Sequence, residues 1–219
     1  MAQNFTIGEV VRYGWDTTMK NLGFLIAVMV VSFAITGIPN AIAQGLTKDH
    51  ALLAAPFSLV AAVLQIIIEI GLIKIALKIH DGQKPEFGDL FSGINQFFRF
   101  LLGSILVGLI VLGGLILLIV PGIIWALKYQ FILYFIVDKQ CGVMEALHKS
   151  GEITQGKKWD LFLLALALLG VNLLGMCACF VGLLISIPVT FMALVYVYRK
   201  LGGELAAAAG PVMEIPPAL

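Results

Sequence analysis

Residues 100–137 read FLLGSILVGLIVLGGLILLIVPGIIWALKYQFILYFIV, and this stretch decides the fold class. Its only charged residue is Lys128. One helix needs about 20 apolar residues to cross ~30 Å of hydrocarbon, so the stretch fits two crossing helices joined by a turn. Its apolar runs are continuous, whereas the strands of a membrane β-barrel alternate apolar and polar residues. The sequence therefore predicts membrane-spanning helices.

The composition of the whole chain agrees with this interpretation. Hydrophobic residues make up 60% of the 219 residues and charged residues only 12%, against about 25% charged in an ordinary soluble domain. Too few polar residues are present to cover a water-facing surface, which excludes a soluble enzyme and a disordered chain. The net charge of +1 does not indicate nucleic-acid binding, and three cysteines do not make a disulfide framework.

We expect an all-α membrane protein with six transmembrane helices arranged as three hairpins. The apolar segments are 22–44, 51–79, 100–137 and 161–198, and each of the last two holds two helices. Proline and glycine are the strongest turn residues, so the turn in the third segment is predicted at Val120-Pro121-Gly122, with Gly113-Gly114 as the alternative. The turn in the fourth segment is predicted between Gly175 and Gly182.

The basic residues predict the orientation. Six spans would divide the loops between the two sides of the membrane. Of the 14 Lys and Arg residues, Lys48 alone then falls on one side, and Lys128 lies within a span. All the others fall on the opposite side, which the positive-inside rule assigns to the cytoplasm. We therefore expect both termini to be cytoplasmic.

The segments that precede each hairpin share an amphipathic pattern. Residues 7–20, 87–99 and 143–154 each place apolar residues on one face at helical spacing and charged residues opposite, which is typical of interfacial helices. One single domain, 1–200, would then contain three repeats, 5–80, 87–138 and 143–200, followed by a cytoplasmic tail at 201–219. The alternative is that every even-numbered bundle contains hairpins, without true repetition.

Two charges within the spans are the candidate functional residues, because ionisable groups in a membrane are rare and costly. Counting from Pro56 puts Glu69 in the cytoplasmic half of its span, and counting from the Pro121-Gly122 turn puts Lys128 ~9 Å below the outer surface. They could form a structural ion pair, or they could belong to a relay or substrate site. Both interpretations stay open from the sequence.

Enzyme signatures do not occur in the sequence. The zinc-protease motif His-Glu-x-x-His, the Gly-x-Ser-x-Gly elbow and the Gly-Lys-Ser/Thr phosphate loop are missing, and His50, His80 and His148 fall in different loops. We therefore expect no catalytic activity, no cofactor and no metal site.

The second half of the chain resembles a known family. The motif Val120-Pro121-Gly122-Ile123-Ile124 is followed by Ser150, Gly156, Pro188 and a Tyr196-x-Tyr198-Arg199 ending. In this order, residues 100–200 resemble the membrane domain of bacterial glycerophosphoryl diester phosphodiesterases and the related YciC-like inner-membrane proteins of unknown function. The resemblance implies a six-helix protein of the bacterial inner membrane. It implies no hydrolysis, because a separate soluble domain carries that activity in the fused members.

Two functions follow as hypotheses. The first is a non-catalytic protein that organises membrane lipids or partner proteins, and the second is a transporter of small solutes or ions that uses Glu69 and Lys128. The expected partners are membrane lipids and other proteins, with no nucleic acid. The sequence leaves the homo-oligomeric state open.

Overall fold

The computed structural model describes residues 5–47, 51–177 and 182–208, and most of these residues are helical. Within those ranges, six helical segments are long and apolar enough to cross a membrane. They are Leu22–Gly45, Ala55–His80, Phe87–Leu117, Ile119–Lys139, Lys158–Cys177 and Leu183–Gly203. The predicted number of apolar spans is therefore confirmed. Lys48 and His50 lie outside the described residues.

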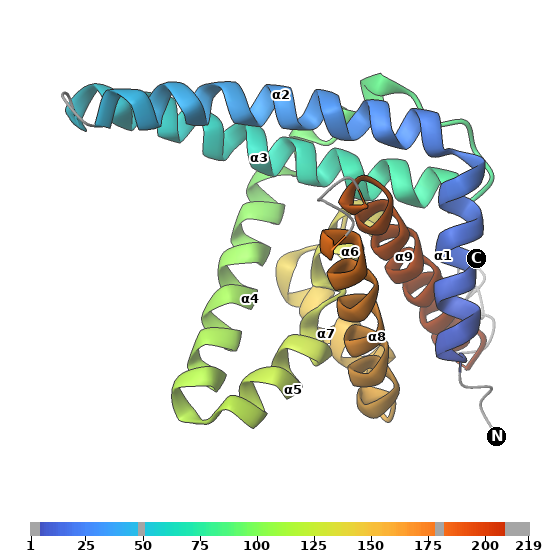
Figure 1. Cartoon of the computed structure of the whole chain (residues 1–219). Coiled ribbons are helices and arrows are strands. Elements are labelled where there is room, and N and C mark those ends of the chain that lie inside the picture. Colours follow the sequence, from blue (N-terminus) through green and yellow to red (C-terminus); the bar gives the residue numbers. More distant parts are fainter. Residues whose placement is uncertain (1–4, 48–50, 178–181, 209–219) are drawn as a thin grey trace, which may run out of the picture.

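The first two spans form a long helical pair. α1 (Ile7–Lys20) leads into α2 (Leu22–Thr47), which packs along α3 (Ala51–His80). Figure 1 shows α2 and α3 side by side, with their adjoining ends extending beyond the other helices. At α1, the Thr6 side chain accepts a hydrogen bond from the Glu9 N–H at 3.3 Å, which satisfies one of the free donors of the first turn.

The apolar face of α1 packs on protein. Val10, Gly14 and Thr18 are buried on this face, and α1 lies along α9 (Leu183–Ala208). A Cβ at Gly14 would come within 2.6 Å of the Val189 carbonyl oxygen, so the glycine permits close contact between the two helices. Trp15, next to this face, is half exposed at 50%.

The second amphipathic segment, 87–99, is not one continuous helix. It begins with two short 3-10 turns, η1 (Phe87–Leu90) and η2 (Ile94–Gln96). The Asp89 carboxylate accepts a hydrogen bond from the Glu86 N–H at 2.8 Å. Such local side-chain bonds compete with the helical backbone pattern. The predicted helix over this segment is therefore wrong in its first part.

The third apolar stretch breaks before its Pro-Gly pair and not at it. α4 (Phe97–Leu117) ends where Leu118 becomes extended (φ −168°, ψ 149°), and α5 (Ile119–Tyr129) follows. Pro121 thus lies in the first turn of α5, where helical N–H groups have no intrahelical partner and a proline costs no hydrogen bond. The turn predicted at Pro121-Gly122 lies too far along the chain by nearly one helical turn, and the alternative at Gly113-Gly114 is inside α4.

The fourth span is made of two short helices. α5 ends at Tyr129 and α6 (Ile132–Lys139) begins after Gln130 and Phe131, where the sequence predicts one helix. The Gln130 side-chain amide donates to the Leu127 carbonyl at 3.1 Å, so it provides a local hydrogen bond at the interruption. Large side chains of this span are fully buried and contribute to the core, among them Phe131, Ile132 and Ile136.

The last three helices are α7 (Val143–Ile153), α8 (Lys158–Cys177) and α9. Gly156, between α7 and α8, has a φ of +75°, a conformation that side-chain-bearing residues rarely adopt. α8 ends at Cys177, within the predicted turn region of 175–182, and α9 begins at Leu183, directly after that region.

α9 extends farther than the sequence predicts. It continues to Ala208, although the predicted cytoplasmic tail begins at residue 201. The start of that tail is therefore helical, and residues 209–219 lie outside the described chain.

The outer surface of the spans is apolar. Phe33, Phe98, Ile116 and Leu174 are all more than 70% exposed. A water-soluble protein rarely exposes so much contiguous apolar surface, whereas hydrocarbon accepts it. The arrangement therefore fits helices surrounded by lipid.

Candidate functional site

The structure does not bring the two predicted intramembrane charges together. No ion pair joins Glu69 to Lys128 in the part of the chain that is described. Glu69 lies on α3 and interacts electrostatically with the buried Tyr134 of α6. Lys128 lies instead against α7. Its Cε would be 3.2 Å from a Cβ placed on Gly151.

The neighbours of Lys128 bear on its predicted position near the outer surface. Near it are residues of α7 and Lys158 at the start of α8, which the charge distribution assigns to the cytoplasmic side. The prediction near the outer surface assumed one straight helix that starts at Pro121-Gly122. In the structure α5 starts earlier, at Ile119, and it ends at Tyr129, so the span neither starts at Pro121-Gly122 nor is one straight helix.

The motif residue Ser150 connects α7 to the end of α5. Its hydroxyl donates to the Lys128 carbonyl at 2.9 Å, and the Thr154 hydroxyl lies 3.1 Å from the same oxygen. Carbonyls in the last turn of a helix lack intrahelical partners, so these hydroxyls satisfy an acceptor that the interruption at Gln130 would leave unpaired. Both Ser150 and Thr154 are fully buried. This gives Ser150 a structural role.

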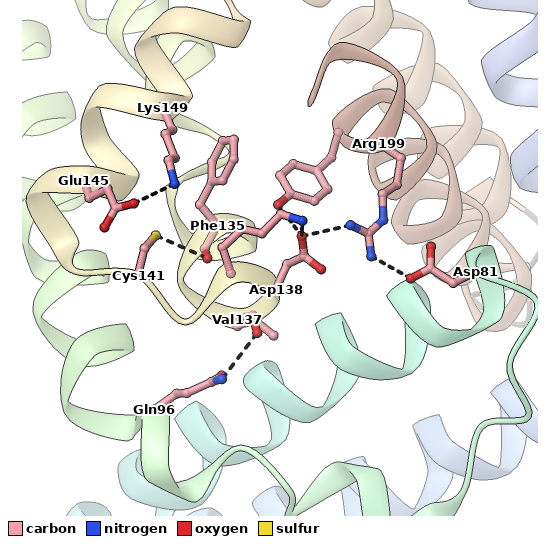
Figure 2. A network of polar contacts seen from close by, with 11 residues as sticks. Asp81, Gln96, Phe135, Val137, Asp138, Cys141, Glu145, Lys149 and Arg199 are labelled. Atoms are coloured by element: carbon pink, nitrogen blue, oxygen red, sulfur yellow. Dashed lines mark hydrogen bonds and ion pairs between the residues drawn. The ribbon is translucent and has the colours of Figure 1, made fainter. Parts of the chain in front are cut away.

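A polar network joins the ends of three helices. Arg199 of α9 donates to Asp138 of α6 at 2.8 Å and to Asp81, just after α3, at 2.6 Å. The Tyr198 hydroxyl donates to the same Asp138 oxygen at 2.8 Å, and Lys139 Nζ lies 3.3 Å from it. Figure 2 shows Arg199 reaching both carboxylates from one side. The network fixes the relative positions of α3, α6 and α9.

A second polar cluster joins α1 to α9. The Glu9 carboxylate accepts hydrogen bonds from the Tyr196 hydroxyl and from Lys200 Nζ, the latter at 3.0 Å. These two hydrogen bonds, the one from Tyr196 foremost, hold the pKa of Glu9 below its usual value. The Tyr13 hydroxyl is 2.8 Å from His80 Nδ1 at the end of α3. Tyr196 and Lys200, one helical turn apart on α9, thus contact α1 through Glu9.

The acids of these clusters are paired with cations. Asp81, Asp138 and Glu9 are all engaged by cationic side chains. Searching the described residues finds no group of three or more His, Cys, Asp or Glu side chains that could hold a metal ion. The geometry is that of structural ion pairs.

A groove lies between α2, α3 and α9. Its volume is about 340 Å³. Most of its lining is apolar, and the polar groups are Ser32, Thr36 and Gln65. The Ser32 hydroxyl oxygen is buried and has no hydrogen-bond partner among the described residues. Pro188, another motif residue, lines the groove from inside α9.

Hydrogen bonds between polar side chains within the spans join α8 to α9. Asn172 donates to the Thr190 hydroxyl and accepts from the Ser186 hydroxyl, both at 2.9 Å. Polar side chains hydrogen-bond across helices in this way because hydrocarbon offers them no other partner. Small residues lie at the same contact, since a Cβ on Gly175 would be 2.6 Å from Ser186 Oγ.

The chain is similar to bacterial proteins of unknown function. Residues 111–203 match a family described as a protein of unknown function (DUF975). An uncharacterized protein of Mycobacterium bovis is 28% identical over 242 aligned residues, which cover 98% of this chain and 74% of the relative. Two uncharacterized proteins of Mycobacterium tuberculosis match over the same shares, at 28% and 27% identity. No solved structure matches the chain.

The residues that carry the network were not singled out as a site by the sequence. Tyr198 and Arg199 appear there only as the ending of a motif, and Asp81 and Asp138 do not appear there. A signal was present, because acids at the ends of two spans and an arginine at the end of a third can meet at one membrane surface. The groove had no comparable signal, since its lining comes from ordinary apolar positions of three helices.

Proposed function

We propose that this chain is a non-catalytic multi-pass protein of the bacterial inner membrane that binds and organises lipids. The observation that carries the proposal is the groove between α2, α3 and α9. Its apolar lining matches an acyl chain, and Phe33, which borders it, is 79% exposed on the outer surface of the helices. A lipid could therefore enter from the side.

The polar groups in the groove support a lipid more than a pure hydrocarbon. Ser32 has a buried hydroxyl without a partner, and leaving such a group unsatisfied costs about 1–3 kcal/mol. An ester or hydroxyl oxygen of a lipid would supply the missing hydrogen bond. Thr36, one turn along α2, donates its own hydroxyl to the Ser32 carbonyl at 2.9 Å.

The transporter hypothesis finds less support. Glu69 does not line the groove, although Gln65, Ile68 and Leu72 on the same helix do. Lys128 lines a different cavity, with residues of α7 and α8, and Glu69 is not part of that lining.

Filling the groove tests this proposal. Met29→Trp combined with Leu72→Trp adds bulk from two sides of the lining, and Val30→Trp adds the same bulk one residue along α2, outside it. Native mass spectrometry of the purified protein would count bound phospholipids. We expect fewer in the double variant and the wild-type number in Val30→Trp. Equal lipid binding by all three proteins, or none by the wild type, would overturn the proposal.

A further inference from the structure

A second cavity and an adjoining groove lie on α5, α7 and α8, away from the groove described above. The cavity, of about 430 Å³, is lined by residues that include Lys128, His148, Glu152 and Lys158. The adjoining groove, of about 400 Å³, is almost entirely apolar. Lys158 lines both, so the two spaces meet at its side chain.

The cavity has an excess of positive charge. Among the described residues, no carboxylate lies within 4 Å of the ammonium groups of Lys128 or Lys158, whereas other lysines of this protein, such as Lys78 and Lys149, are paired in this way. Glu152 is the only acid in the lining, and it contacts His148 at 3.2 Å. Two ammonium groups therefore face one carboxylate that is already engaged.

The fold gives Lys128 space in this cavity. Gly151 faces it, and a Cβ there would lie 3.2 Å from Lys128 Cε. The ammonium group is 5.0 Å from the centre of the Tyr129 ring, a contact that favours a cation without neutralising its charge. A half-buried cation without a counter-ion is costly, and an anionic ligand would relieve this cost.

The apolar groove extends from this charge along α5 and α8. Its lining includes Ile123, Ile124 and Leu127 from α5 and Phe162 from α8. Trp159 also lines it, is 69% exposed, and stacks on Phe162 with ring centres 5.5 Å apart. Exposed tryptophan is typical of the interface between hydrocarbon and headgroups, which puts the cationic cavity at headgroup level.

We infer that this pair of cavities binds one anionic glycerophospholipid, with its phosphate between Lys128 and Lys158 and an acyl chain in the apolar groove. The two lysines lie next to the apolar groove, just as the phosphate of a phospholipid lies next to its acyl chains. The inference rests on the proposed lipid-binding function and adds a second site with a preferred lipid class. A zwitterionic headgroup would gain less, because its ammonium group would face the two lysines.

The test uses the full chain purified in detergent and an equal mixture of phosphatidylglycerol and phosphatidylethanolamine with identical acyl chains. Native mass spectrometry should show that the wild type retains phosphatidylglycerol preferentially. A lysine near an anionic headgroup is worth about a fivefold change in binding, so Lys128→Gln with Lys158→Gln should weaken phosphatidylglycerol binding about 30-fold. The control Arg12→Gln with Lys84→Gln removes the same charge from exposed positions elsewhere and should keep the preference.

Further variants separate a lipid from a free phosphate. Ile124→Trp fills the groove without changing charge and should also lower phosphatidylglycerol binding, and Lys128→Arg with Lys158→Arg should retain it. The inference is overturned if the charge-matched control loses as much as the lysine variant, if Ile124→Trp binds normally, or if glycerol phosphate alone competes at equal concentration. Wild-type protein that binds both lipids equally would refute this site only, whereas wild-type protein without lipid would refute the proposed function.

Discussion

Arg199 joins three parts of the molecule, namely α9, α6 and the residue that follows α3. It reaches the acids of two other helices, and its own side chain is 24% exposed, while that of Asp138 is 11% exposed. Charge-assisted hydrogen bonds at such low exposure contribute more to stability than surface ion pairs do. Asp138 accepts from both Arg199 and Tyr198, so it is the residue whose replacement disturbs the network most directly.

Asp138→Asn should therefore destabilise the protein. The amide can accept one of the hydrogen bonds but removes the negative charge that faces Arg199, and we expect a loss of about 1–3 kcal/mol. In thermal unfolding in detergent this corresponds to a decrease in apparent Tm of roughly 2–12 °C for a chain of this size. Arg12→Gln is the control, because it breaks an ion pair with Asp16 whose side chains are 85% and 55% exposed. If both variants unfold alike, the network does not stabilise the fold.

Cys141 should react slowly with alkylating agents. Its thiol is 7% exposed and donates to the Phe135 carbonyl at 3.4 Å. Burial, with a smaller effect from Glu145, raises the pKa of this thiol, so less of the reactive thiolate exists at a given pH. In a Cys179→Ser background, iodoacetamide at pH 8 should modify the exposed Cys177 first, as read by mass spectrometry of the digested protein. Equal rates in folded protein would contradict the burial of Cys141.

At the scale of helices, hydropathy predicts where spans exist but not where each one bends. The sequence locates six apolar segments because each must bury about 20 residues in hydrocarbon. It misplaces the α4–α5 turn, because Pro121 is equally compatible with a turn and with the first turn of a helix. It also misses the interruption between α5 and α6, which depends on hydrogen bonds from α7, a helix distant in sequence.

Glycine contacts between helices are similarly hard to predict. Gly71 of α3 touches the backbone of η1, and a Cβ there would come within 2.4 Å of the Leu90 Cα and carbonyl oxygen. Gly108 of α4 has nothing within 4 Å. The two residues look alike in the sequence, since each interrupts an apolar run, and only the partner segment distinguishes them.

Gly71→Ala should destabilise the protein and Gly108→Ala should not. The first places a methyl group against backbone that cannot rotate away, and overpacking of this kind costs about 1–3 kcal/mol. The second adds a better helix former at an open position. Thermal unfolding of both variants in the same detergent gives the comparison. A tolerated Gly71→Ala would show that η1 does not pack on α3 as described.

The candidate site was predictable only in part, because the sequence shows which residues are charged but not which residues lie near them in the fold. Glu69 and Lys128 both lie within apolar spans, but their partners depend on how the helices pack, and Lys128 lies beside α7. The unpaired lysines at the α5–α8 cavity became visible only once the carboxylates around them could be placed.

At the scale of the whole molecule, orientation in the membrane remains a prediction that charge alone supports. Cysteine placed at position 48 should react with a membrane-impermeant thiol reagent on intact cells, while cysteines at positions 84 and 158 should not, in a chain without its native cysteines. This is the result expected if both termini are cytoplasmic. Modification of all three positions would contradict the six-span arrangement, and modification of 84 and 158 alone would reverse it.

The hydrogen bond from Ser150 to the Lys128 carbonyl has a consequence for biosynthesis. A ribosome makes α5 before it makes α7, because synthesis proceeds from the N-terminus. Until residue 150 has left the ribosome, the end of α5 lacks the hydroxyl that satisfies its carbonyl in the finished protein. The end of α5 therefore cannot reach its final form in the order in which the chain is translated. Helices α4 and α5 are made first, and this hydrogen bond forms only after α7 has been made.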